Sequence, residues 1–131
     1  ISSLEGKYFL IAEDNEINAE ILLEILLSEG ANCEICENGQ IALERFKASQ
    51  EGEFDAILMD VQMPVMNGYE ATKAIRALER EDAGKIPIIA MTANAFAEDE
   101  KEALEAGMNV HVAKPIDIEL LKKVIRQCVR N

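Results

Sequence analysis

Three acids, one hydroxyl and one lysine each stand at the end of a short apolar run with the composition of a buried strand. They are Glu13, Asp14, Asp60, Thr92 and Lys114. If these runs form one parallel sheet, their carboxyl ends meet at one edge, where open α/β sheets bind ligands. Three carboxylates crowded together repel one another and need a cation. An oxygen-only ligand set favours Mg²⁺ over softer metals.

The lysine and the hydroxyl suit a phosphoryl group bound beside that cation. Lys114 and the metal would offset the phosphoryl charge, and Thr92 would donate a hydrogen bond. A carboxylate can attack phosphorus, so Asp60 is the candidate for an aspartyl phosphate. Taken singly, a strand-end Asp or Thr is more often a turn residue. It is the joint placement of the five residues that favours phosphoryl chemistry.

The elements that must position these residues alternate along the chain. Five apolar segments are expected as strands: 7–12, 32–36, 56–59, 86–91 and 110–113. Five segments are expected as helices: 15–28, 40–49, 69–81, 96–106 and 117–129. This alternation predicts an α/β fold, a doubly wound parallel sheet in a single domain. In the second helix Ile41, Leu43 and Phe46 are expected to point inward, and residues 82–85 are expected to form a loop.

Charge and composition exclude several classes of function. The 131 residues carry 25 acids and 13 bases, a net charge of −12, which argues against direct binding of nucleic acid. No apolar run could span a membrane and no signal peptide opens the chain, so a cytoplasmic location is predicted. Cys33 and Cys36 have C-x-x-C spacing, but positions three apart on a strand face opposite ways, which disfavours a redox pair.

Four motifs resemble the receiver domain of two-component response regulators, over almost the whole chain. They are residues 11–15 (IAEDN), 59–68 (MDVQMPVMNG), 91–93 (MTA) and 113–115 (AKP). The resemblance implies a flavodoxin-like fold, a five-stranded sheet of order 2-1-3-4-5 with five helices.

The resemblance also implies roles for the strand-end residues. Asp60 would take a phosphoryl group from a histidine kinase or a histidine phosphotransfer domain. Thr92 would bind the phosphoryl oxygen and swing inward, Lys114 would pair with the phosphate, and the Lys114–Pro115 bond is usually cis in the family. The implied Mg²⁺ ligands are Glu13, Asp14, Asp60 and the backbone carbonyl of Gln62.

Residues 13–18 (EDNEIN) look most like receivers attached to hybrid sensor histidine kinases. Residues 1–6 would then be the remnant of a linker from a kinase core, and residues 7–131 the receiver domain. The chain begins at Ile1 rather than Met, which suggests a piece of a longer protein. Such a domain would not be an enzyme with a diffusible substrate; it would phosphorylate and dephosphorylate only itself.

Two other functions remain open. A Mg²⁺-dependent phosphatase of the haloacid dehalogenase kind also uses a strand-end Asp, but it needs a second Asp two residues later, where this chain has Gln62. A receiver-shaped binding module that is no longer phosphorylated is the other alternative. Retention of all five strand-end residues disfavours it.

His111, the only histidine, departs from the family pattern. It stands three residues before Lys114, where receivers usually carry the Tyr or Phe that reorients with the threonine. One interpretation is a half-buried ring that fills the place of an aromatic side chain. The other is a switch residue whose charge adds a pH-dependent bias, because histidine titrates near neutrality.

Apolar residues of the first helix spread over ~240° of the helical wheel, wider than packing on one sheet face requires. Neighbouring elements could cover the excess. Alternatively, a spare flank of Ala19, Leu23 and Leu27, with Pro115 in a nearby loop, docks the helices of a partner.

Overall fold

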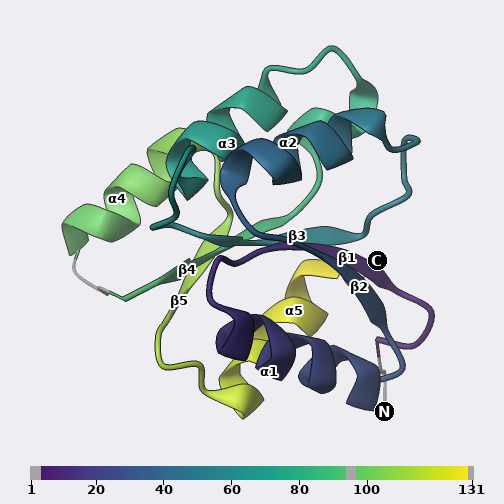
Figure 1. The fold of residues 1–131 in the computed structure, drawn as a ribbon. Coiled ribbons are helices and arrows are strands. Elements are labelled where there is room, and N and C mark those ends of the chain that lie inside the picture. Colours follow the sequence, from purple (N-terminus) through teal and green to yellow (C-terminus); the bar gives the residue numbers. More distant parts are fainter. Residues whose placement is uncertain (1–3, 94–96, 130–131) are drawn as a thin grey trace.

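One parallel sheet of five strands forms the centre of the molecule, in the order β2-β1-β3-β4-β5 (Figure 1). The structure is a computed structural model that describes residues 4–93 and 97–129. The strands are β1 Tyr8–Ala12, β2 Asn32–Cys36, β3 Ala56–Asp60, β4 Ile88–Thr92 and β5 Val110–Ala113. The helices are α1 Glu16–Ser28, α2 Gly39–Ala48, α3 Gly68–Arg76, the 3₁₀ turn η1 Glu81–Gly84, α4 Ala97–Ala106 and α5 Ile118–Val129. The predicted doubly wound, flavodoxin-like α/β fold is confirmed.

Helices cover both faces of the sheet, α1 and α5 on one and α2, α3 and α4 on the other (Figure 1). Successive strand residues therefore enter two different cores. In β3, Ile57 and Met59 pack with residues of α2 and α3, whereas Leu58 packs with α1 and α5. All five residues of β3 are buried. This burial on both faces explains why the run showed no alternation of polar and apolar residues.

Asparagines fix where three of the helices begin, at the carboxyl edge of the sheet. The Asn15 and Asn38 side chains accept hydrogen bonds from the backbone N–H groups three residues later, at 3.0 and 2.8 Å. Asn67 and Glu70 form a capping box at the start of α3. Each cap ends the preceding loop at a defined residue, which holds the loops around the sheet edge in place.

Three local expectations were wrong. The helix expected at 69–81 ends at Arg76, and most of the loop expected at 82–85 lies in η1. The chain turns there because the Arg80 guanidinium donates to the carbonyls of Phe46 and Ser49 and to Asp82. Ile41 is 40% exposed, because α2 turns the Ala42 and Phe46 stripe inward instead. The expected start of α4 at Phe96 lies outside the described residues.

The beginning of the chain packs on the domain from Leu4 onward. Leu4 is 1% exposed, and the Gly6 N–H donates to the Gly30 carbonyl at 3.0 Å. Whether residues 1–6 derive from a linker stays a prediction.

The two cysteines of β2 do face opposite ways, since Cys33 contacts the core under α1 and α5 and Cys36 belongs to the other core. Burial raises the pKa of both thiols to about 11, which disfavours the reactive thiolate. Among the described helices, none has the length and apolar character needed to cross a membrane.

Candidate functional site

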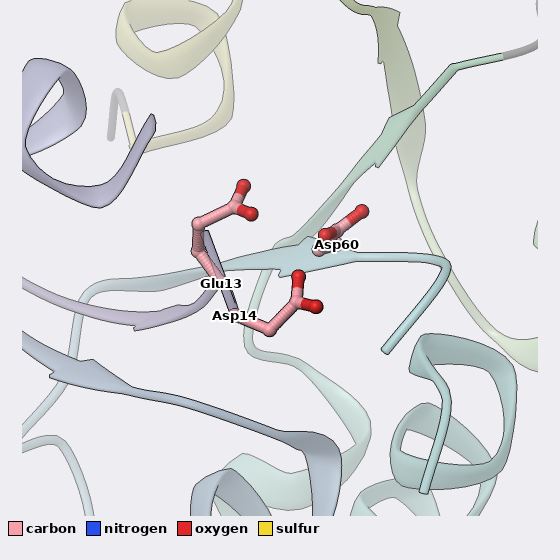
Figure 2. Close-up of side chains that lie close together, drawn as sticks. All are labelled: Glu13, Asp14 and Asp60. Atoms are coloured by element: carbon pink, nitrogen blue, oxygen red, sulfur yellow. The ribbon is translucent and has the colours of Figure 1, made fainter. Parts of the chain in front are cut away.

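Three carboxylates converge at the carboxyl edge of the sheet, as Figure 2 shows. Glu13 and Asp14 follow β1, and Asp60 ends the neighbouring strand β3. One oxygen of each side chain lies within 4.8 Å of the others. Glu13 is 2% exposed and Asp60 3%, whereas Asp14 is exposed. The predicted clustering of these acids is therefore present.

Backbone hydrogen bonds continue beyond the strand ends and fix the direction of the acids. The Glu13 N–H donates to the Cys36 carbonyl at 2.9 Å, and the Val61 N–H donates to the Met91 carbonyl at 2.9 Å. The start of α3 packs directly on β3, because a Cβ at Gly68 would overlap the Asp60 carbonyl oxygen. Only glycine allows this close approach.

Lys114 is the one lysine that reaches the acids among the described residues. Its Nζ lies 3.1 Å from Glu13 Oε1 and 3.1 Å from Asp60 Oδ2. The backbone N–H of Lys114 donates to the Thr92 carbonyl at 2.7 Å, and the Lys114–Pro115 peptide bond is cis. Burial opposes the charged ammonium, but the hydrogen bonds to Glu13 and Asp60 outweigh burial and raise the pKa of Lys114.

The single ammonium does not neutralise the three acids. The pKa of Asp60 is raised to about 6, mainly by burial and then by repulsion from Glu13. Lys114 opposes this rise but does not cancel it. Glu13 Oε1 is a buried oxygen whose one ion-pair partner among the described residues is the Lys114 ammonium, which it shares with Asp60. Buried acids of this kind require further positive charge. A hard divalent cation such as Mg²⁺ fits the oxygen ligands of Glu13, Asp14 and Asp60.

An open cleft of about 640 Å³ lies beside the acids. Its lining residues are Asp14, Val61, Gln62, Met63, Pro64, Asn67, Tyr69, Thr92, Asp99 and Glu102. Thr92, which is 6% exposed, and Gln62 thus lie on the same cleft as Asp14, as the strand-end argument requires. The roles assigned to these side chains, and to the Gln62 carbonyl, stay predictions.

Sequence reasoning missed three residues of this cleft. Tyr69 lies in the first turn of α3, and its hydroxyl donates to the Asp99 carbonyl of α4 at 3.5 Å. Glu102 lies one turn further along α4. The available signal was topological, since α3 and α4 both begin at the carboxyl edge.

The predicted docking flank of α1 is partly wrong. Ala19 is 6% exposed and so cannot lie on a free flank, and Leu23 is half-buried. Leu27 is 52% exposed, and Pro115 is exposed. The most exposed apolar residue of α1 is Ile17, at 72%. The free apolar surface of α1 therefore includes its first turn, beside Glu13 and Asp14.

His111 lies on β5 and faces α4. Its Nδ1 is 3.4 Å from Glu100 Oε2, and the two side chains are 21% and 55% exposed. This half-buried position fits a ring in the place of an aromatic side chain, and the acidic neighbour offers an attraction only when the ring is protonated. Both interpretations of His111 therefore stand as predictions.

The family of response regulator receiver domains matches residues 9–126, and the chain belongs to it. The chain is 42% identical over 118 residues to the hybrid signal transduction histidine kinase I of Dictyostelium discoideum, covering 88% of this chain and 7% of the relative. It is 39% identical over 117 residues to the sensor protein GacS of Pseudomonas syringae pv. syringae, covering 88% of this chain and 13% of the relative. The chain thus spans only a small part of the curated relatives it matches.

Solved structures agree with this assignment. The receiver domain of a sensor histidine kinase from Pseudomonas aeruginosa PAO1, with a magnesium ion coordinated in its active site cleft, is 36% identical with a TM-score of 0.86, covering 96% of this chain and 99% of that one. The Saccharomyces cerevisiae receiver domain of Ssk1, crystallised with the histidine phosphotransfer protein Ypd1, is 34% identical with a TM-score of 0.85, covering 94% and 88%. The chain is a receiver domain of two-component signalling.

Proposed function

We propose that this receiver domain is a phosphoacceptor switch in which Asp60 takes a phosphoryl group from a phosphohistidine in a Mg²⁺-dependent reaction. One observation carries the proposal: the Lys114 ammonium lies 3.1 Å from both Glu13 and Asp60, in an acid cluster that is still short of positive charge. A structural salt bridge would not need the second buried acid or the exposed Asp14.

The chemistry uses the chain's own residues. An Asp60 oxygen attacks phosphorus, the new P–O bond forms as the P–N bond to the donor imidazole breaks, and the imidazole leaves with the bonding electron pair. Lys114 exchanges its contact with the Asp60 carboxylate for one with a phosphoryl oxygen. Thr92 donates its hydroxyl to another phosphoryl oxygen and moves inward, and His111 on the neighbouring strand β5 moves with it. Bound Mg²⁺ would neutralise the carboxylates of Glu13, Asp14 and Asp60, with the Gln62 carbonyl as a further ligand.

The partner we propose is a histidine kinase or a histidine phosphotransfer domain, and the parent chain a hybrid histidine kinase with its receiver in the cytoplasm. The support is the similarity to receivers within hybrid kinases and to the Ssk1 receiver crystallised with Ypd1. The domain alone would have no diffusible substrate apart from the phosphodonor.

Intact mass after incubation with Mg²⁺ and acetyl phosphate tests the phosphoacceptor. We expect one added phosphoryl group on the wild type, and none on Asp60→Asn or on wild type in EDTA. Fluoroberyllate binding, followed by amide NMR shifts of Thr92 and His111, reports the switch without any dependence on phosphoryl lifetime.

An unmodified wild type that also fails to bind fluoroberyllate would contradict the proposal. If the mass were unchanged but fluoroberyllate bound, fast self-hydrolysis would explain the missing adduct. An adduct that persists in Asp60→Asn would move the acceptor to another residue.

A further inference from the structure

Helix α4 contributes two carboxylates to the cleft beside Asp60. Asp99 and Glu102 both line this cleft, which also holds Asp14 and Thr92. Asp99 is half-buried and Glu102 is exposed. They stand three residues apart, so one face of α4 carries both. The described lining residues include no lysine, arginine or histidine. The charges on the lining are therefore all negative.

No nearby base balances the two carboxylates of α4. Of the lysines and arginines that the structure describes, none forms an ion pair with Asp99 or Glu102, and Lys114 is paired with the two buried acids instead. Tyr69, on the wall of the cleft, responds to both charges. Its pKa is raised, first by burial and then by the nearby Glu102 and Asp99. The negative charge on α4 therefore acts inside the cleft.

Folding accounts for only one of the two charges. Asp99 is the third residue of α4, where an acid interacts favourably with the helix dipole. The Tyr69 hydroxyl also donates to the Asp99 carbonyl at 3.5 Å, which holds the first turn of α4 beside α3. Glu102 lies beyond that turn, and the effect of the dipole falls off within it. The Glu102 charge therefore acts mainly on whatever enters the cleft.

A phosphoryl group meets this charge on its way to Asp60. Asp60 is 3% exposed, and Thr92 shares the lining of the cleft with Asp99 and Glu102. Bound Mg²⁺ would offset Asp14, but neither carboxylate of α4 belongs to the described cluster of metal-binding acids. A free acyl phosphate is a dianion and brings no positive charge. A phosphohistidine carried by a protein can arrive with lysines or arginines beside it, and these would offset the repulsion.

We propose that Asp99 and Glu102 form an acidic rim that slows phosphorylation of Asp60 by free anionic phosphodonors, an inference that rests on the proposed function. With acetyl phosphate, an Asp60 oxygen attacks phosphorus as the P–O bond to acetate breaks, and acetate leaves with the bonding electron pair. The rim opposes the approach of the dianion, because like charges repel. Asp99 and Glu102 thus determine donor specificity and touch no reacting atom.

Neutral variants of the acidic rim test the inference with two donors of different charge, the dianion acetyl phosphate and the monoanion phosphoramidate. At saturating Mg²⁺ and low ionic strength, we expect Asp99→Asn/Glu102→Gln to raise the second-order rate constant of labelling about tenfold with acetyl phosphate and about threefold with phosphoramidate. Glu102→Gln alone, which leaves the first turn of α4 intact, should give about threefold with acetyl phosphate. In about 0.5 M NaCl the gains should fall below about twofold, because salt screens the charges.

Labelling is followed by intact mass, together with donor consumption in excess of that by Asp60→Asn, which detects a short-lived phosphoryl group. The matched control is Glu51→Gln/Glu81→Gln, which changes the net charge of the protein by the same amount. Both glutamates are exposed and line a different hollow, before β3 and β4 at the opposite edge of the sheet. The control should be labelled at about the wild-type rate.

An unchanged rate in the double rim variant would overturn the inference. An equal gain in the control would also overturn it, because net charge alone would then explain the effect. So would an equal gain with both donors that persists in salt, since the substitutions would then act through the conformation of α4. If neither the wild type nor the rim variant were labelled or consumed either donor, the proposed function would fail, and the rim inference with it.

Discussion

The two edges of the sheet differ in how far their buried charges are neutralised. At the carboxyl edge, three carboxylates gather around one lysine that pairs with only two of them, and the pKa of Asp60 is raised to about 6. Near the amino edge, Arg80 reaches Asp82 through two hydrogen bonds and also donates to the carbonyls of Phe46 and Ser49. The hydrogen bond from Arg80 is the main reason that the pKa of Asp82 lies below its ordinary value.

Backbone conformation follows the same division. Val65, at the carboxyl edge, has a positive φ, whereas Arg76 and Arg80, toward the other edge, connect loops through hydrogen bonds to backbone carbonyls. Arg76, for example, donates to the carbonyls of Ala83 and Gly107. The contrast indicates that one edge maintains the fold while the other keeps a local excess of negative charge for a ligand. Substitutions at the two edges should therefore change stability in opposite directions.

The largest effect is expected for Arg80→Met. The variant removes the guanidinium that lies over the Phe46 ring, pairs with Asp82 and donates to the Ser49 carbonyl. The Phe46 carbonyl keeps the donors of Ser49, and Asp82 keeps only the Gly52 N–H from another described residue. We expect the free energy of unfolding to fall by about 3 kcal/mol in urea titrations. Acetyl phosphate labelling of the folded variant should be unchanged. Arg45→Met, which removes the more exposed pairs with Glu34 and Glu53, is the control and should cost clearly less. Equal losses would contradict the special role of Arg80.

Asp60→Asn should stabilise the metal-free protein. Because burial raises the pKa of Asp60 in the folded state to about 6 from 3.8, the folded wild type retains a proton over this range and loses stability as pH rises through it. The variant should exceed the wild type by about 2 kcal/mol above pH 7 in EDTA, and the difference should vanish near pH 4. A difference in stability that does not change with pH would show that ionisation of Asp60 does not destabilise the folded protein.

Bound Mg²⁺ should reduce the repulsion among the same carboxylates and so stabilise the folded protein. At a concentration ten times its Kd, the ion should stabilise the wild type by about 1.4 kcal/mol. Thermal melts with and without Mg²⁺ measure this shift, and Asp60→Asn, which keeps two of the three carboxylates, should respond less. Equal shifts in the two proteins would place the bound ion elsewhere.

The smallest effect is expected at His111. His111 Nδ1 lies 3.4 Å from Glu100 Oε2, and the side chains of the pair are 21% and 55% exposed. Because the pair is partly exposed, His111→Tyr should change the free energy of unfolding by at most about 0.5 kcal/mol, measured in urea titrations. If the phosphorylated-state conformation is also unchanged from pH 6 to pH 8 in both proteins, His111 serves only as a packed ring.

The strand-end acids illustrate what could be predicted from sequence. The apolar run at residues 56–59 identified a strand buried on both faces, and the alternation of segments then placed Glu13, Asp60 and Lys114 at one edge. Helix ends were less predictable. α3 ends early, and the segment that follows it is held by Arg80, which contacts Phe46 and Ser49 more than thirty residues away along the chain. Ala19 was misplaced because periodicity on α1 does not reveal which flank its neighbours cover.

By itself the sequence determined the fold class, the strand-end chemistry and the receiver motifs, because these depend on local composition and on the rule that parallel strands share one carboxyl edge. Only the tertiary structure decided how strongly Asp60 is perturbed, which cleft residues α3 and α4 contribute, and that Val65 is held at positive φ. Those properties arise from burial and from contacts between distant segments, which no local pattern in the chain records.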